Sequence, residues 1–388
     1  MTSFLKLALR NGMRHKLRTG LTVLGLVVAI LSFGLLQSIV DAWYAGADRA
    51  AANRLVTRNA ISLVFPMPIN YREKIRAVEG VRSVAVANWF GGVYRDTSMA
   101  NFFPRFAVDA EQYFAMYPEY VLNEDEFRAF LRDRKGAVIG RKLALQHGFR
   151  IGDTIPIQGD IFPGNWEFTV RAIYDGAEPN TDTSLMFFHF DYLNETLKQR
   201  VPGRADKVGV FVVAIEDVGR AAEIARAIDE QFKNSAAETL TETEKAFQIG
   251  FAKQTEAIVI AVRFVSYVVI AIILAVMANT MAMTARERMT EYATLKALGF
   301  PPAFIAALIL GESLAIAVIG AAIGIGLTFP VGYWFAAKMG TLFPVFGISP
   351  QTVGLQAVCA LVVGIAAALL PMRRAARVNI VEGLRFVG

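Results

Sequence analysis

Side chains that could carry out catalysis are few in this sequence of 388 residues, and they do not form a catalytic group. His15, His147 and His189 lie in unrelated segments, and none has another His or a Cys at the spacing of a metal site. The acidic run at 124–126 fits the solvated start of a helix better than an acid/base pair. The sequence therefore predicts a non-catalytic chain with no metal or cofactor of its own.

Hydrolysis of ATP would need a phosphate-binding loop of the form GxxxxGK[ST]. The sequence contains no Gly-Lys pair, so it has no such loop. If ATP drives this protein, we expect another chain to hydrolyse it.

The segment Arg286–Phe300 (RERMTEYATLKALGF) is charged and helix-prone, although it stands between two apolar segments. On a helical wheel one side is apolar and could rest on a membrane surface, with Met289, Tyr292, Ala293 and Phe300. The other side mixes charge with exposed leucine, as protein-docking surfaces do, with Glu287, Arg288, Glu291, Leu295 and Leu298. Lys296 falls on the apolar side, where its stem could lie along the membrane, and Gly299 before two prolines ends the helix.

The elements that must position this segment are apolar runs long enough to cross a membrane, at 21–40, 257–283, 303–330 and 352–370. The first run could instead belong to a cleaved signal peptide. It is longer than the roughly 7 to 15 residues of a signal core, which favours an uncleaved anchor.

The orientation follows from Lys and Arg, which mark the cytoplasmic side of short flanking segments. Basic residues precede the first run, occur between the second and third, and follow the fourth, whereas 331–351 contains only Lys338. Both termini and the charged segment are therefore predicted to be cytoplasmic, with residues 41–256 outside.

The positive charge of the chain reflects this topology. Residues 41–256 contain 26 Lys and Arg against 30 Asp and Glu, so the excess positive charge lies on the cytoplasmic flanks. We therefore expect membrane lipid and no nucleic acid among the partners. The single cysteine, Cys359, excludes an intrachain disulfide.

The large outer segment is predicted to fold as an α+β domain with two ferredoxin-like parts, at about 60–100 and 205–235. The first part shows a strand–helix–strand pattern, at 61–65, 71–78 and 81–90. The second part shows a strand and a helix, at 208–215 and 218–232. A smaller β-rich insertion at about 100–200 and a helical stalk at about 235–256 complete the predicted domain.

The predicted layout therefore alternates between membrane and water. Its segments in chain order are a cytoplasmic amphipathic helix (1–18), a span (19–40), the outer domain (41–256), a span (257–284), a cytoplasmic helix (285–302), a span (303–330), an outer loop (331–351), a span (352–371) and a cytoplasmic tail (372–388).

Three further sites follow from residue type and position. Glu312 lies inside the third predicted span, where a charge either has a function or is paired near the cytoplasmic interface. Gly320 and Gly324 form a GxxxG pattern, which favours close packing of another helix. Phe103 and Phe188 belong to aromatic clusters that either contact an apolar ligand or fill the core of the outer domain.

Taken together, these segments resemble the MacB/FtsX-type permeases of ABC transporters, the mechanotransmission (type VII) family. The resemblance is carried by RERMTEYATLKALGF after the second span, GES with Glu312 in the third, and PMRRAARVNIVEGLR after the fourth. The start, LALRNGMRHKLRTGLTVLGLVVAI, and the order of one span, a large domain and three spans also resemble the family.

The resemblance implies a bacterial inner-membrane permease that forms a dimer with a second copy or a paralogue. A separate cytoplasmic ATPase would bind ATP and Mg²⁺, and a periplasmic adaptor or effector protein would bind outside. The segment matching Arg286–Phe300 is the coupling helix of the family, so the expected ATPase contacts are Glu287, Arg288, Glu291, Leu295, Lys296, Leu298 and Gly299.

The expected function is ATP-driven efflux, or export of a lipid, lipoprotein or other amphiphile. An FtsX-like alternative is signalling, in which the permease moves nothing and activates a periplasmic cell-wall hydrolase. A membrane-anchored binding protein without a motor is disfavoured by the coupling-helix pattern.

Overall fold

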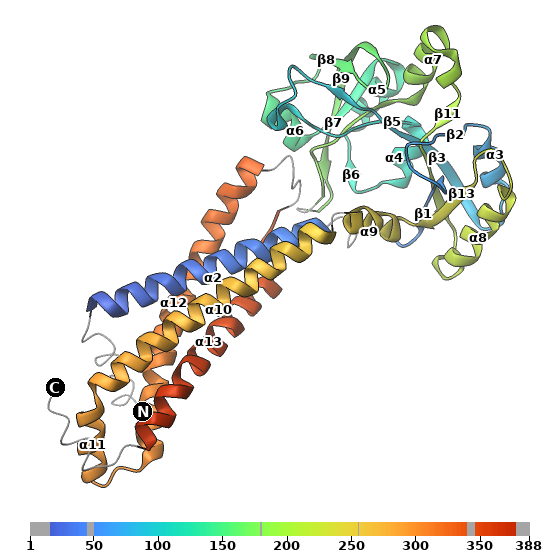
Figure 1. Cartoon of the computed structure of the whole chain (residues 1–388). Helices are drawn as coiled ribbons and strands as arrows, with labels where there is room; N and C mark the ends of the chain where they lie inside the picture. The colour runs from blue at the N-terminus through green and yellow to red at the C-terminus, as the bar shows by residue number, and fades with distance from the viewer. Residues whose placement is uncertain (1–15, 45–49, 179–180, 255, 340–345, 378–388) are drawn as a thin grey trace. The chain divides into compact units, whose positions relative to one another are not determined.

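The computed structural model describes residues 16–44, 50–178, 181–254, 256–339 and 346–377. They form two compact units, a helical unit and a large domain made mainly of Tyr44–Gln254 (Figure 1). Most of the predicted amphipathic helix at 1–18 and much of the predicted tail at 372–388 lie outside the described residues.

In its described residues the helical unit consists of four long helices and one short helix: α2 (Lys16–Tyr44), α10 (Glu256–Glu287), α11 (Met289–Ala297), α12 (Pro302–Met339) and α13 (Pro350–Ala376). The four long helices are each long and apolar enough to cross a membrane, in agreement with the four predicted spans. The short helix α11 lies within the charged segment.

Helix α12 is longer than predicted, because the segment 331–339 continues the helix instead of forming a loop. Pro330 lies inside it. A proline inside a helix removes one backbone hydrogen bond and crowds the carbonyl four residues earlier. In a membrane helix neighbouring groups can satisfy the freed carbonyl, so the helix can continue past it. The prediction of a loop throughout 331–351 is therefore wrong in its first part, and 340–345 lie outside the described residues.

Across the described residues of the large domain, eleven strands form one mixed sheet with the path β13-β1-β12-β3-β5-β10-β7-β9-β8-β4, and β6 pairs with β9. The strands are β1 (Arg54–Asn59), β3 (Val81–Trp89), β4 (Gly92–Val93), β5 (Arg105–Val108), β6 (Tyr120–Val121), β7 (Gly136–Gly140), β8 (Thr154–Gly159), β9 (Gly164–Gly176), β10 (Met186–His189), β12 (Val210–Ile215) and β13 (Thr239–Thr243). A separate pair consists of β2 (Met67–Pro68) and β11 (Lys207–Val208).

Helices pack against this sheet: α3 (Tyr71–Arg76), α4 (Ala110–Met116), α5 (Glu124–Arg132), α6 (Arg141–His147), α7 (Phe190–Arg200), α8 (Ala221–Gln231) and α9 (Glu244–Gln254), with short 3₁₀ turns at Met99–Asn101, Pro202–Arg204 and Val218–Arg220. Alternation along the strands separates two hydrophobic cores. Val84 and Val86 belong to one core, and Ala85 and Ala87 to the other. The α+β architecture is as predicted.

The predicted insertion is not a separate body. Strand β5 pairs with β3, with Ala87 opposite Val108, and β10 pairs with β5. Backbone hydrogen bonds therefore join the strands of the predicted ferredoxin-like parts directly to the strands of the predicted insertion. One mixed sheet contains both.

The first predicted strand is also displaced. The strand is β1 at 54–59, while the apolar run at 61–65 forms a loop in which Ile61 and Val64 are 81% and 84% exposed. The strand RLVTRN was missed because two arginines make it look like a surface segment. Pairing with β12 on one side and β13 on the other buries it.

The predicted helical stalk begins later than expected. Residues 239–243 form β13, and the helix α9 starts only at Glu244. The sequence TLTET alternates, with Thr239 and Thr241 buried. Pairing with β1 satisfies backbone groups on one side of this edge strand, and the N–H of Thr241 donates instead to Oδ2 of Asp229, 3.0 Å away. The strand pairing outweighs the helix propensity of the neighbouring residues.

Candidate functional site

The charged segment folds as a helix between two turns. Helix α10 ends at Glu287, and Arg288 forms the turn into α11. After α11, Gly299 adopts a φ of +91°, a left-handed conformation that suits glycine and ends the helix before Pro302 starts α12. Tyr292 and Ala293 are buried, on the side that the helical wheel predicts to be apolar.

The turn residue Arg288 lies inside the unit and joins α11 to α12. Its Nη1 is 3.0 Å from Oε2 of Glu312, and its Nε is 2.8 Å from Oε2 of Glu291. The side chain of Arg288 is 12% exposed and that of Glu312 is 4% exposed. Of the two roles considered for Glu312, the structure shows the paired carboxylate, because a buried charge of this kind is stable only with a close partner.

Two other residues of the segment make contacts within the helical unit. Glu287 forms two hydrogen bonds with the guanidinium of Arg18 on α2, of 2.7 and 2.8 Å. Nζ of Lys296 donates to the backbone oxygen of Ala376, 2.7 Å away, at the last residue of α13. This carbonyl is one of those that a helix end leaves without an intrahelical donor.

The segment is therefore tied to α2, α12 and α13. Some of its residues contact these helices, and others are exposed. Arg288 is directed inward, so the prediction that it contacts an ATPase does not fit its position. Glu287 and Lys296 are each held by a contact within the unit. Leu298 is 71% exposed and Phe300 is 40% exposed, whereas Leu295 and Glu291 are partly exposed. Leu298, beside Gly299, is the most exposed large apolar side chain of the segment.

The glycines of α12 lie against α2, as the GxxxG pattern suggests. A Cβ atom on Gly320 would be 2.7 Å from Cδ2 of Leu26, and one on Gly324 would be 3.0 Å from Cβ of Ile30. A side chain on Gly320 would therefore require Leu26 to shift, and one on Gly324 would press against Ile30 and the backbone oxygen of Val27. Gly326 has nothing within 4 Å of its Cβ position, so it does not take part in this packing.

A polar group near the other end of the helical unit was missed. Oδ2 of Asp41 accepts hydrogen bonds from the hydroxyls of Ser349 and Thr352, at 2.9 and 2.7 Å. Nε2 of Gln356 donates to the backbone oxygen of Ile30 and to Thr328, at 2.8 and 2.9 Å. These bonds join α2, α12 and α13. A polar residue inside an apolar run is the sequence signal that could have identified Gln356.

The aromatic candidates of the large domain are core residues. Phe103 and Phe188 are buried in the same hydrophobic cluster, and Phe188 packs against Phe90 and Phe168 with ring centroids 5.2 and 4.5 Å apart. A ligand could reach either ring only if the core opened. The predicted ligand contact therefore does not fit the structure, and the alternative of core packing does.

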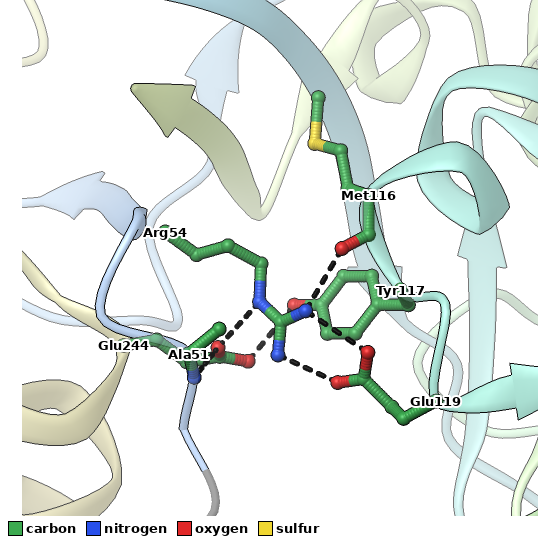
Figure 2. Close-up of polar contacts among 6 residues, drawn as sticks. All are labelled: Ala51, Arg54, Met116, Tyr117, Glu119 and Glu244. Carbon is green, nitrogen blue, oxygen red and sulfur yellow. Dashed lines mark hydrogen bonds and ion pairs between the residues drawn. The ribbon is translucent and has the colours of Figure 1, made fainter. Parts of the chain in front are cut away.

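A buried cluster around Arg54 was missed entirely (Figure 2). Arg54 is the first residue of β1, and its Nε is 2.7 Å from Oε2 of Glu244, the first residue of α9. Its Nη2 is 2.6 Å from Oε1 of Glu119, and its Nη1 donates to the backbone oxygen of Met116 at 2.8 Å. The side chains of Arg54 and Glu244 are 5% and 7% exposed.

The ring of Tyr117 completes this Arg54 cluster. The guanidinium carbon of Arg54 lies 4.0 Å from the ring centroid, and the Tyr117 hydroxyl donates to Oε1 of Glu244 at 3.0 Å. Burial raises the pKa of Tyr117 well above its ordinary value of 10.0, so the phenol keeps the proton that it donates. Burial lowers the pKa of Arg54, but its bonds with Glu119 and Glu244 outweigh this and raise it overall, so the arginine stays charged.

No group of three or more His, Cys, Asp and Glu side chains in the described residues could hold a metal ion. The charged clusters instead connect segments of the chain that are distant in sequence. Their chemistry is that of structural ties, which can hold one element in a fixed position relative to another.

Family models match both units of the chain. Residues 263–380 match the FtsX-like permease C-terminal model, and residues 19–231 match the MacB-like periplasmic core domain model. The second match alone covers more than half of the sequence.

Two relatives show how far the similarity extends. One is named "Probable export ATP-binding/permease protein MacB", from Pseudomonas entomophila, and is 32% identical over 106 residues, 27% of this chain and 16% of its own length. The other is named "Uncharacterized ABC transporter permease MJ1507", from Methanocaldococcus jannaschii, and is 23% identical over 399 residues, 97% of this chain and 96% of its own length.

Solved structures with some similarity include the periplasmic region of MacB from Actinobacillus actinomycetemcomitans, with a TM-score of 0.37 and 10% identity over 52% of this chain and 94% of that one. The extracellular domain of the ABC-type transporter YknZ from Gram-positive bacteria gives a TM-score of 0.35 and 11% identity over 49% of this chain and 100% of that one.

Proposed function

The chain belongs to the MacB/FtsX-type family of ABC transporter permeases, and from this premise we propose that it transmits the ATP-driven movement of a separate ATPase to its large domain. The proposed result is export of an amphiphile, such as a lipid or a lipoprotein, on the outer side of a bacterial inner membrane. ATP and Mg²⁺ would be bound by the ATPase, and both termini of the permease would be cytoplasmic.

The observation that carries this proposal is the way α11 is held. A short helix that receives force must not turn independently of the spans. Contacts with Arg18, Glu312 and Ala376 tie the segment of α11 to three other helices of the unit. The exposed Leu298 then offers an apolar anchor for a partner.

Export is favoured over signalling by the large domain. Residues 19–231 match a MacB-like periplasmic core, and the relative named MacB is described as an export protein. The proposed assembly is a dimer with a second copy or a paralogue, an ATPase for each half and a periplasmic adaptor. FtsX-like activation of a cell-wall hydrolase is the alternative outcome.

The first test is to purify the tagged full-length protein from crosslinked native membranes and to identify its partners by mass spectrometry. An ABC ATPase together with a membrane-fusion adaptor is the expected result. An ATPase together with a cell-wall hydrolase would instead support signalling. Absence of any ATPase after crosslinking would overturn the coupling proposal.

The second test addresses α11 directly. Leu298→Glu places a charge on the exposed apolar anchor, and we expect ATPase binding about 30-fold weaker, the effect of losing a hot spot of about 2 kcal/mol. Leu298→Met is the control, because it keeps an apolar side chain of similar size. Binding is measured with both purified proteins in detergent. Equal binding by the two variants would remove Leu298 from the docking surface.

A further inference from the structure

The Arg54 cluster lies where the chain enters and leaves the large domain. Strand β1 is the first element of the domain after α2, and α9 is the last element before α10. Arg54 at the start of β1 is paired with Glu244 at the start of α9, and the backbone N–H of Ala51 also donates to Glu244, at 3.3 Å. One carboxylate therefore contacts both of the chain segments that lead to the spans.

The same arginine also binds a third segment that belongs to the body of the domain. Met116 ends α4, and Glu119 follows it in the connection to β6. Helix α4 contributes Tyr113 and Phe114 to the hydrophobic core on one face of the sheet. Arg54 thus connects both chain ends of the domain to an element that is packed on the sheet.

Burial makes the pair of Arg54 and Glu244 stiff, whereas the side chain of Glu119 is 31% exposed. An exposed ion pair exchanges its partner for water at little cost, whereas opening a buried pair leaves two charges without solvation. Arg54 is held from several directions by two carboxylates, a backbone carbonyl and an aromatic ring (Figure 2). A bend at either junction would have to break several of these contacts together.

We propose that the Arg54 cluster makes both chain connections of the large domain move as one body with its sheet. Motion arriving through α2 and α10 then reaches the strands and is not absorbed by bending where β1 and α9 begin. Arg54 and Glu244 are positioning residues for force transfer. This inference rests on the proposed function, because it concerns the path by which ATPase movement would reach the domain.

The structure provides a matched control. Arg58 and Glu242 form an ion pair of 3.1 Å between β1 and β13, with side chains 22% and 24% exposed. Arg58 is the same kind of residue in the same strand, but its partner belongs to β13 and not to α9. Loss of this pair should weaken β1–β13 pairing without freeing α9.

The test uses the full-length protein with Cys359 replaced by serine and spin labels on two exposed residues, Lys253 of α9 and Glu230 of α8. Electron spin resonance measures the distribution of distances between the labels. We expect a narrow distance distribution with one peak in the parent protein and in Arg58→Met. In Arg54→Met the distribution should be broad. A distribution in Arg54→Met as narrow as in the parent, or equal broadening in Arg58→Met, would overturn the proposal.

If Arg54→Met does not reach the membrane, Arg54→Lys serves in its place. Lysine keeps the charge but cannot reach both carboxylates and the carbonyl at once, so the distribution should also broaden. A narrow distribution in Arg54→Lys would then overturn the proposal.

A second measurement adds the ATPase found by co-purification. In the parent protein, ATP should change the distance between a label on α10 and one on the sheet, and in Arg54→Met hydrolysis should continue while that change is lost. A full distance change in Arg54→Met would contradict the role in force transfer. If the parent itself binds no ATPase, the proposed function fails, while the first measurement still decides whether the cluster fixes α9.

Discussion

Two buried arginines of the large domain differ in how their charge is compensated. Arg54 has two carboxylate partners, whereas Arg105 has one hydrogen bond within the described residues, from Nη2 to the backbone oxygen of Gly92. Nε and Nη1 of Arg105 are buried and have no partner in the described part of the chain. Its guanidinium lies 4.7 Å from the ring of Phe103, and burial lowers its pKa to about 10.

The two residues should therefore respond differently to substitution by methionine. Arg54→Met leaves the buried carboxylate of Glu244 without a cationic partner, and we expect a loss of about 3 to 5 kcal/mol in the unfolding free energy of the domain. Arg105→Met removes a poorly compensated charge, so stability should be unchanged or higher. Hydrogen exchange of the sheet amides in the full-length protein measures both. If Arg105→Met lowered the unfolding free energy as much as Arg54→Met does, the buried charge of Arg105 would be as well compensated as that of Arg54.

The stability of the large domain at low pH should depend on His189. The centroid of its ring is 4.2 Å from that of Phe130. Its Nε2 is 2.8 Å from the carbonyl oxygen of Phe130, which accepts a hydrogen bond when the neutral ring carries its proton on Nε2. Burial lowers the pKa of His189 below its ordinary value of 6.5, so the folded state binds a proton less readily than the unfolded state. Stability is then fully present above pH 6.5 and is lost as the pH falls toward the folded pKa.

His189→Gln should flatten this dependence, because glutamine can donate to the same carbonyl but does not titrate. The unfolding midpoint of the domain is measured at pH 7.5 and at pH 5.5 for both proteins. We expect a smaller decrease in the variant. An equal decrease would assign the acid sensitivity to other groups, among them His147, whose pKa is also lowered by burial.

At the scale of the element, the contact between α2 and α12 can be tested with two glycines of one helix. Gly320→Ala places a Cβ atom 2.7 Å from Leu26, whereas Gly326→Ala meets nothing within 4 Å. Alanine favours a helix over glycine by about 1 kcal/mol. We expect Gly326→Ala to raise the unfolding temperature in detergent and Gly320→Ala to lower it. Equal behaviour of the two variants would mean that α2 and α12 separate at little cost.

The helices and strands that a pattern in their own sequence determines were predictable. The four long helices follow from apolar runs, since no other element buries such a segment in a membrane. The strands β1 and β13 were not predictable in the same way. RLVTRN and TLTET contain several polar residues, and they form strands by pairing with each other and, for RLVTRN, with β12.

At the scale of the whole molecule, the sequence predicted the order of units and the family, but not the charged ties. Arg54 and Glu244 are 190 positions apart, and Arg18 and Glu287 are 269 apart. Such pairs leave no local pattern, because each partner resembles an ordinary surface residue until the fold brings the two together. Glu312 could be identified because its neighbours in the sequence are apolar. Its partner Arg288 is only 24 positions away.

The pairing of β1 with β13 also has a consequence for how such a chain can diversify. Leu55 of the first strand lies opposite Thr243 of the last, so the large domain begins and ends at neighbouring positions. A domain with adjacent ends can be exchanged as a cassette, because a replacement needs only two nearby attachment points between α2 and α10. A lineage could then acquire a different large domain by recombination at these two points, while the four long helices remain unaltered.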